Sequence, residues 1–422
     1  MSLPDAVSDP LEEWVIQQRW FASKSREIAS LNTLERVELS REPALAIALV
    51  EARFQSGMHE LYQLVPGDPD GARVLADLLG GEAAIGGVTF HGGVRPTGEM
   101  RAMGAEQSNS SVVFGGELVL KVFRRLEPGV NPELEMLRFL SLRGFPNIAA
   151  LRGWYEYSGE LMHATLGILQ EYVGAARDGW QLAMDDPAAL LARVPALGTA
   201  TGEMHTVLAS DGDDPAFAPE EPSAEALSLL TATIDEQIER VFLDLPADDD
   251  ALAPIRGRGE EVRERLQLMS HVGVGGRLIR HHGDYHLGQT LLGDDARWII
   301  LDFEGEPARS LLERRRKRSP LRDVAGMLRS FAYAASAARL LRGEPAPEGW
   351  EQAARDGFLE AYMDAVDPTL LPAGRPATEK LLAIFELEKA VYELRYELNN
   401  RPDWVPIPVA GIARLLETEV TS

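Results

Sequence analysis

The residue types that could do chemistry are concentrated in one segment, His281–Glu304, which reads HHGDYHLGQTLLGDDARWIILDFE. Asp284 lies in a turn-forming H-G-D sequence, Gln289 follows five residues later, and Asp302 ends the apolar run that starts at Trp298. Phosphoryl transfer needs a carboxylate that orients and deprotonates a hydroxyl group, and oxygen ligands that hold Mg²⁺ on the phosphates of ATP. The spacing predicts Asp284 as the general base and Gln289 and Asp302 as magnesium ligands.

Each half of this pattern also has an ordinary structural explanation, because Gly and Asp are common in turns and an Asp can simply end a strand. The two halves are joined, however, by a predicted hairpin in which Thr290–Leu292 and Trp298–Leu301 flank the turn Gly293-Asp294-Asp295. Together they have the layout of a kinase catalytic loop followed by its metal-binding segment. The combination favours a phosphotransferase site over two unrelated turns.

A second group of residues, earlier in the chain, could bind the nucleotide. Lys121 lies on the predicted strand Leu118–Phe123, where a Lys can reach the phosphates of ATP if a carboxylate from the following helix holds it. Glu133 and Glu135 are the candidates, and Glu135 is preferred because Glu133 falls in the first helical turn, where the helix dipole already accounts for an acid. The other candidates are polar side chains of the preceding turn and a strand end whose backbone could bind adenine: Gln107, Ser108, Asn109, Ser110, Ser111, Glu171 and Val173.

The acceptor side is predicted on the helix that ends near Arg401. One face of this helix is apolar and another carries carboxylates and flat aromatic rings. That combination suits a sugar, because hydroxyl groups need acceptors and the C–H faces of sugar rings stack on aromatic side chains. The candidate substrate residues are Glu393, Tyr396, Arg401 and Trp404, together with His205 on a separate predicted helix. The alternative, which spacing alone favours, is a solvated acidic face, and a lone helical His is more often structural.

Composition limits the possible partners. The chain has 42 basic and 66 acidic residues, a net charge of −24, which argues against nucleic acids and anionic membranes because both need a basic face. The absence of Cys excludes disulfides and zinc–thiolate sites. The sequence shows neither a secretory signal nor a run of the ~20 apolar residues that a spanning helix needs. We therefore expect a cytoplasmic protein.

Length and pattern predict more than one lobe, since 422 residues exceed one ordinary core. The Gly- and Pro-rich stretch at residues 80–98 is typical either of a boundary between two lobes or of a long surface loop within one lobe. Two hairpins flanking a helix then predict a small α+β lobe that ends near residue 175, and the rest of the chain is predicted to be mostly helical.

Seven segments of the chain, spread over residues 18 to 408, resemble bacterial maltokinases. They read QRWFASK, EQSNSSVVF, LKVFRRLEPGVNPE, HGDYHLGQ, LDFEGEPAR, SPLRDVAGMLRSF and NRPDWVPIP. The resemblance implies an α+β, bilobal, protein-kinase-like fold, similar to eukaryotic-type kinases and aminoglycoside phosphotransferases. It implies an N-terminal cap at residues 1–95, a nucleotide-binding lobe at 96–175 and a mostly helical lobe at 176–422. It also implies Asp284 as the base, with Gln289, Asp302 and the assisting Glu304 as ligands of Mg²⁺.

The resemblance also implies a reaction. Maltokinases use ATP to convert maltose to maltose 1-phosphate for α-glucan and glycogen synthesis, which implies a functional link to trehalose synthase and a maltosyltransferase. Actinobacterial glucosamine kinases share the architecture and many of these motifs, so glucosamine, or another sugar or aminoglycoside, is the alternative acceptor; the segments EGEPAR and SPLRDVAGMLRSF favour maltokinase. A non-catalytic pseudokinase would have lost Lys121, Asp284 or Asp302, and a protein kinase would have a longer activation segment after Asp302.

Overall fold

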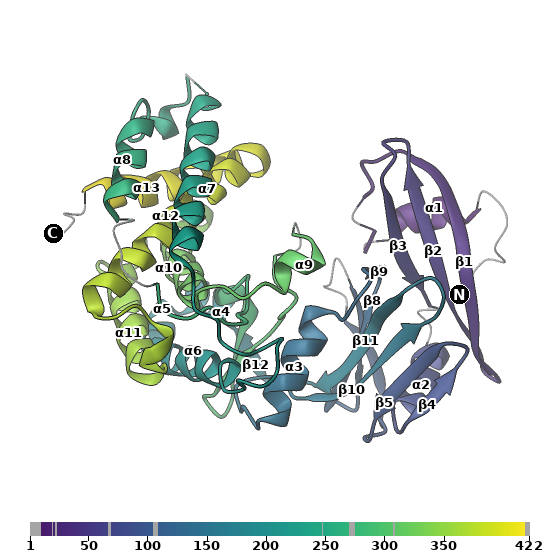
Figure 1. Cartoon of the computed structure of the whole chain (residues 1–422). Helices are drawn as coiled ribbons and strands as arrows, with labels where there is room; N and C mark the ends of the chain where they lie inside the picture. The colour runs from purple at the N-terminus through teal and green to yellow at the C-terminus, as the bar shows by residue number, and fades with distance from the viewer. Residues whose placement is uncertain are drawn as a thin grey trace. The chain divides into compact units, whose positions relative to one another are not determined.

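The chain forms two compact units, Met1–Ala175 and Ala176–Ser422, in a computed structural model. The structure describes residues 10–18, 20–21, 23–65, 69–103, 109–246, 248–269, 275–306 and 309–417. The first unit contains most of the strands and the second most of the helices (Figure 1), so the predicted α+β class is confirmed. Within the described residues, none of the helices combines the length and apolar character required to cross a membrane.

The first unit begins with a four-stranded antiparallel sheet in the order β1-β2-β3-β9. Its long strand β2 is buried along nearly all of its length and packs against an aromatic cluster that includes Trp20, Phe21 and Tyr62. The elements of this part are α1 (Pro10–Gln17), β1 (Ile28–Arg41), β2 (Ala44–Phe54), β3 (His59–Leu64), α2 (Pro69–Leu78) and β9 (Arg125–Leu126). Trp20 and Phe21 of the QRWFASK segment therefore serve as core residues of this sheet.

A seven-stranded sheet in the order β4-β5-β10-β11-β8-β7-β6 forms the rest of the unit. Its strands are β4 (Ala83–Ile85), β5 (Val88–Gly92), β6 (Met100–Met103), β7 (Asn109–Phe114), β8 (Leu118–Phe123), β10 (Leu151–Ser158) and β11 (His163–Glu171). Helix α3 (Pro132–Leu142) contacts β10. Pro132 occupies the first turn of α3, and Asn131 caps the helix by accepting from the N–H of Glu133 at 2.8 Å.

The expected boundary at residue 95 does not separate these two sheets. β4 and β5 precede it but pair with each other and with β10, whereas β9 follows it and pairs with β3. The Gly- and Pro-rich stretch contains two short strands and not only a linker, because its Gly86-Gly87 pair adopts the positive φ angles of a tight hairpin turn between β4 and β5.

The second unit contains the predicted catalytic hairpin in a small sheet of order β12-β13-β14. Its strands are β12 (Ala176–Asp178), β13 (Thr290–Gly293) and β14 (Trp298–Ile300), with Thr290 opposite Ile300. Ten helices are described around it: α4 (Gly179–Asp185), α5 (Pro187–Leu191), α6 (Val194–Leu208), α7 (Ala224–Leu243), α8 (Gly259–Met269), α9 (Leu311–Arg314), α10 (Leu321–Arg342), α11 (Trp350–Ala365), α12 (Arg375–Asn400) and α13 (Pro406–Glu417). Helices α10 and α12 pack on each other, as do α6 and α11.

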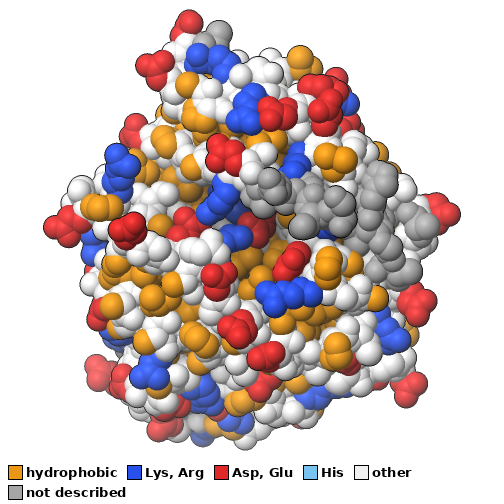
Figure 2. Space-filling model, turned by 90° about the vertical axis from the view of Figure 1, so that its left-hand side faces the viewer, with side chains coloured by type: hydrophobic (Ala, Val, Ile, Leu, Met, Phe, Trp, Pro, Cys, Tyr) orange, Lys and Arg blue, Asp and Glu red, His pale blue; other side chains and the backbone are white. Residues whose placement is uncertain are grey.

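Helix α12 is buried on more than its apolar face. Ile384 and Val391 lie in the core as the spacing predicts, but Glu386, Glu393 and Glu397 are also buried. The alternative of a solvated acidic face is therefore wrong. On the molecular face drawn in Figure 2, acidic and basic side chains are interspersed among the coloured residues, so this view shows no extended basic surface.

Candidate active site

The loop that carries Asp284 is held by a buried carboxylate from the first turn of α10. The backbone N–H groups of His282 and Gly283 donate to the two oxygens of Asp323 at 2.7 and 2.9 Å, and Asp323 is 2% exposed. Gly283 has a φ of +86°, a left-handed conformation that costs Gly little. Asp323 thus fixes the bend that presents the side chain of Asp284. Asp323 lies inside the segment SPLRDVAGMLRSF, but no role was predicted for it, and the loop that it binds is 40 residues or more away in the sequence.

His205 belongs to this support and is not a substrate ligand. Its side chain is 0% exposed, and its ring nitrogens lie 3.1 Å from Asp323 and 3.1 Å from the hydroxyl of Tyr362. A fully buried ring whose two nitrogens are both engaged cannot reach a bound sugar, so the prediction for His205 is wrong. Burial raises the pKa of Asp323, but His281 and the hydrogen bond with His205 lower it by more, so the pKa of Asp323 lies below its ordinary value.

Two basic side chains flank the Asp284 carboxylate, one on each oxygen. Lys389 of α12 places Nζ 3.9 Å from Oδ1, and His286 places Nε2 3.9 Å from Oδ2. Lys389 was not singled out from the sequence, although it lies four residues before Glu393 on the predicted acceptor helix, and residues at this spacing share a helix face. These contacts hold the Asp284 carboxylate in position at the centre of the site.

The predicted magnesium ligands lie together at the end of the hairpin. Gln289 Nε2 donates to Asp302 Oδ2 at 3.0 Å, and Asp302 and Glu304 each bring a carboxylate oxygen to within 4.8 Å of the other. Asp302 has a φ of +60°, a left-handed conformation that costs a non-Gly residue about 1–3 kcal/mol and is often found at functional sites. Two carboxylates and one amide oxygen are the hard donors that Mg²⁺ prefers, so these residues fit that ion.

In the first unit, Lys121 is held by Glu133 and not by the preferred Glu135. Lys121 Nζ lies 2.6 Å from Glu133 Oε2, and the side chains are 11% and 2% exposed. Glu133 lies in the first turn of α3, which Asn131 caps, and its carboxylate contacts Lys121 of β8. Glu133 therefore both complements the helix dipole and fixes Lys121, so the preference for Glu135 is wrong.

The turn predicted to cover the phosphates is only partly described. Gln107 and Ser108 lie outside the described residues. Asn109 and Ser111 are buried on β7, and Ser111 is directly opposite Lys121 in the β7–β8 ladder. Their part in nucleotide binding stays a prediction.

The remaining nucleotide candidates lie at the ends of strands. Ser110 accepts from Nε of the buried Arg124 at 2.9 Å. Glu171, at the end of β11, forms an ion pair with Arg152, and Val173 follows it in a partly exposed position. A role of Glu171 and Val173 in adenine binding would depend on their backbone, and it also stays a prediction.

In the second unit, the residues predicted to bind the acceptor share one hollow of about 420 Å³ with Asp284. The four that line it are Glu393, Tyr396, Arg401 and Trp404. Trp404 stacks on Tyr333 with ring centroids 6.2 Å apart, and the Arg401 guanidinium lies 4.8 Å from the centroid of the Trp404 ring. The hollow thus combines aromatic walls with hydrogen-bonding groups beside a potential base.

The carboxylates that line this hollow are already paired with cations. Glu393 accepts from Nε and Nη2 of the buried Arg329 at 2.9 and 2.7 Å. Glu397 accepts from Nε and Nη2 of Arg401 at 2.9 and 2.7 Å, and Asp284 faces Lys389. The partner of Glu393 could not be anticipated from the sequence, because Arg329 lies 64 residues away on another helix.

Comparison with known proteins adds to this geometry. Residues 14–77 match the maltokinase N-terminal cap domain, and residues 99–362 match the phosphotransferase enzyme family. The chain is similar to a glucosamine kinase of Streptacidiphilus jiangxiensis, with 29% identity over 345 residues that cover 78% of this chain and 75% of the relative. It is also similar to a glucosamine kinase of Mycolicibacterium smegmatis, with 28% identity over 333 residues that cover 75% of this chain and 79% of the relative.

A solved structure has the same fold. It is a glucosamine kinase in complex with glucosamine, ADP and inorganic phosphate, with a TM-score of 0.73 and 21% identity over 97% of this chain and 100% of the other. The predicted fold, with an N-terminal cap, a β-sheet lobe and a helical lobe, is therefore confirmed.

Proposed function

Because the chain belongs to the phosphotransferase enzyme family, we propose that it is an ATP-dependent sugar kinase. The observation that carries this proposal is the 420 Å³ hollow, in which the Asp284 carboxylate shares one space with Tyr396, Arg401 and Trp404. A base and a surface suited to sugar rings are thus present at the same place.

The proposed reaction assigns a step to each group. Asp284 accepts the proton of the acceptor hydroxyl as its oxygen bonds to the γ-phosphorus and the bond from that phosphorus to the departing ADP oxygen breaks. Lys389, with Nζ 3.9 Å from Asp284 Oδ1, positions that carboxylate. Gln289, Asp302 and Glu304 would hold Mg²⁺, which would supply positive charge to the phosphates. Lys121, fixed by Glu133, binds the phosphates of ATP.

We favour maltose as the acceptor, which makes the product maltose 1-phosphate. Each carboxylate that lines the hollow has a cationic partner, so a sugar ammonium group would have to compete with Lys389, Arg329 or Arg401 for its counter-ion. A neutral disaccharide needs only hydrogen bonds and stacking surfaces, which the hollow provides. The maltokinase cap at residues 14–77 supports the same choice. In this function the enzyme acts in the cytoplasm, with trehalose synthase and a maltosyltransferase as functional partners in α-glucan synthesis.

Glucosamine is the second candidate acceptor, and it is favoured by the similarity of this chain to proteins that are named glucosamine kinases. Both curated relatives and the solved structure are glucosamine kinases. A glucosamine kinase would use one of the paired carboxylates for the ammonium group.

The test is a sugar panel with ATP consumption and ³¹P NMR of the product, using maltose, glucosamine, glucose and an aminoglycoside. We expect the highest kcat/KM for maltose and a phosphate on its anomeric oxygen. A clear preference for glucosamine would replace maltose with the second candidate. Turnover of none of the four, in protein that binds ATP, would contradict the sugar-kinase proposal.

A further inference from the structure

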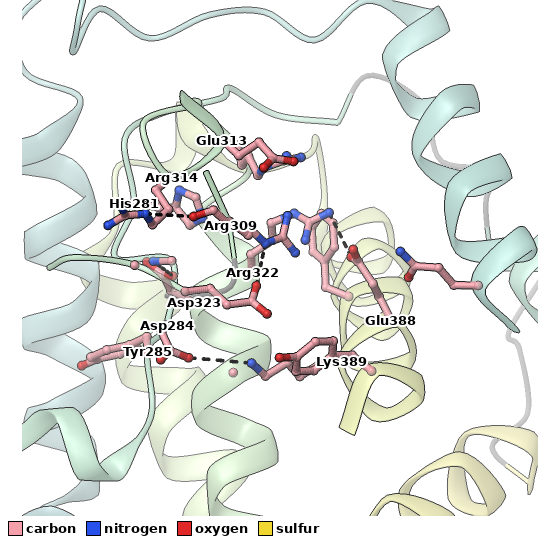
Figure 3. Close-up of a pocket in the computed structure, with 18 residues that line it drawn as sticks. His281, Asp284, Tyr285, Arg309, Glu313, Arg314, Arg322, Asp323, Glu388 and Lys389 are labelled. Carbon is pink, nitrogen blue, oxygen red and sulfur yellow. Dashed lines mark hydrogen bonds and ion pairs between the residues drawn. The ribbon is translucent and has the colours of Figure 1, made fainter. Parts of the chain in front are cut away.

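A second, smaller hollow of about 110 Å³ also has Asp284 in its lining. Four arginines line it, and they come from the segment after Glu304 and from the start of α10: Arg309, Arg314, Arg318 and Arg322. Figure 3 shows Arg309, Arg314 and Arg322 in the upper part of this hollow and the Asp284–Lys389 pair below them. Lys389 lines both hollows, so the two spaces meet at the proposed base.

Most charges around the smaller hollow are paired within the protein. Arg309 Nε lies 2.6 Å from Glu306, and Arg322 Nη2 lies 2.9 Å from Glu388. Arg314 donates to the carbonyl oxygens of Arg309 and Glu304 at 3.2 and 3.0 Å. These contacts fix the cations in place around the cavity.

Arg318 differs from the other three. Among the described residues, its side chain makes neither an ion pair nor a hydrogen bond with another group, although it is partly buried. Its backbone is fixed, because its N–H and C=O both bond to Ile279 at 2.9 Å. Burial and the guanidinium groups of Arg322 and Arg309 lower the pKa of Arg318 to about 10 although the Glu388 carboxylate acts in the opposite direction, and the side chain remains a cation at neutral pH. Glu388 is the nearby carboxylate, but it is paired with Arg322 at 2.9 Å, so it offsets the charge of Arg318 only in part, and a partly buried cation beside like charges favours a bound anion.

We propose that the hollow beside Arg318 binds a phosphate group. Guanidinium groups present forked N–H donors that match phosphate oxygens, and Arg318 and the neighbouring Arg322 line the same cavity. The smaller hollow has a volume of about 110 Å³, a quarter of that of the 420 Å³ hollow lined by Tyr396 and Trp404. This small volume suits a single phosphate group better than a sugar ring.

The phosphate group has two possible sources, inorganic phosphate and the phosphorylated sugar product. The second source rests on the proposed sugar-kinase function. In that case the site retains the product close to Asp284 and makes the enzyme sensitive to inhibition by its own product.

The first experiment titrates inorganic phosphate into the full-length protein by calorimetry, without nucleotide and at ionic strength matched with chloride. We expect saturable binding that Arg318→Gln weakens roughly tenfold or more, because a charge-assisted hydrogen bond is lost. Arg297→Gln is the control, since it removes the same charge from the exposed hairpin turn, where Arg297 pairs with Asp295 at 3.3 Å; it should bind phosphate as the wild type does. Arg318→Lys keeps the positive charge but loses the paired N–H donors of the guanidinium group, so its affinity for phosphate should be intermediate between those of the wild type and Arg318→Gln.

Absence of phosphate binding to the wild type, or equal binding by the wild type and a folded Arg318→Gln, would overturn the proposal. This experiment needs no turnover, so its outcome is independent of the proposed function.

The second experiment measures inhibition of the wild type and Arg318→Gln by the sugar phosphate that the enzyme makes. If Arg318→Gln relieves this inhibition as well as weakening phosphate binding, the product occupies the site. If only the binding of inorganic phosphate changes, free phosphate is the ligand. Either outcome supports the site.

Discussion

Glu393→Gln tests whether the buried ion pair between Glu393 and Arg329 stabilises the wall of the 420 Å³ hollow, here called the sugar hollow. The substitution preserves the shape of the side chain but removes the charge that accepts two hydrogen bonds from Arg329, at 2.9 and 2.7 Å. Arg329 is 2% exposed and Glu393 9%, so the guanidinium would stay buried without its counter-ion. Breaking a buried ion pair by removing one partner costs about 3–5 kcal/mol. In a unit of this size each kcal/mol lowers Tm by about 2–4 °C, so we expect Tm to fall by about 6–20 °C.

The assay combines thermal unfolding with sugar kinetics at a temperature where the variant is folded. We expect kcat/KM for the sugar to fall roughly tenfold or more, because a polar wall of the hollow is disturbed, while KM for ATP is unchanged. Tyr396→Phe is the matched control: Tyr396 lines the same hollow but is 44% exposed, so the sugar kinetics should change without a change in Tm. A Tm of Glu393→Gln within about 2 °C of the wild type would refute the ion-pair reasoning. A lowered Tm with normal sugar kinetics would show that Glu393 supports the wall without affecting the acceptor.

Four further substitutions address the other groups. Asp284→Asn should lower kcat by about 10²–10⁴-fold, with ATP binding retained in a nucleotide titration; near-normal turnover would remove Asp284 from the mechanism. Asp302→Ala should abolish activity without rescue by added sugar, and full activity at ordinary Mg²⁺ would exclude it as a ligand. Glu133→Gln should raise KM for ATP at saturating sugar, because Glu133 fixes Lys121 at 2.6 Å; an unchanged KM would disprove that role. Because the pKa of Asp323 is below its ordinary value, its stabilising contribution is complete above about pH 4 and is lost as pH falls further. The urea concentration at the midpoint of unfolding should therefore fall less between pH 4 and lower pH for Asp323→Asn than for the wild type.

Local sequence predicted the parts of the site that are close together in the chain. The H-G-D turn, Gln289 and Asp302 are separated by one hairpin, and the residue types of that hairpin determine its turn and register. The pocket-lining face of α12 was also predictable, because it follows from helical periodicity.

The partners of these residues depend on contacts between distant segments, and local pattern carries no information about them. Asp323 reaches His205 across 118 residues, and Arg329 reaches Glu393 across 64. The choice between Glu133 and Glu135 failed for a related reason, since it depends on how α3 is oriented on its sheet. Where a charged residue had both a local and a long-range explanation, the sequence could not reveal that both apply.

The exchange of short strands between the two sheets of the first unit constrains how the cap could be transplanted. A cut at residue 95 would remove β4 and β5 from the seven-stranded sheet, exposing an unpaired edge of β10, and would leave β3 without β9. Unpaired edges promote aggregation and pairing with other chains. A chimera that grafts this cap onto another phosphotransferase would therefore need β9 from the donor together with the first strands. The segment that can be exchanged as a whole is the pair of interleaved sheets and not the cap alone.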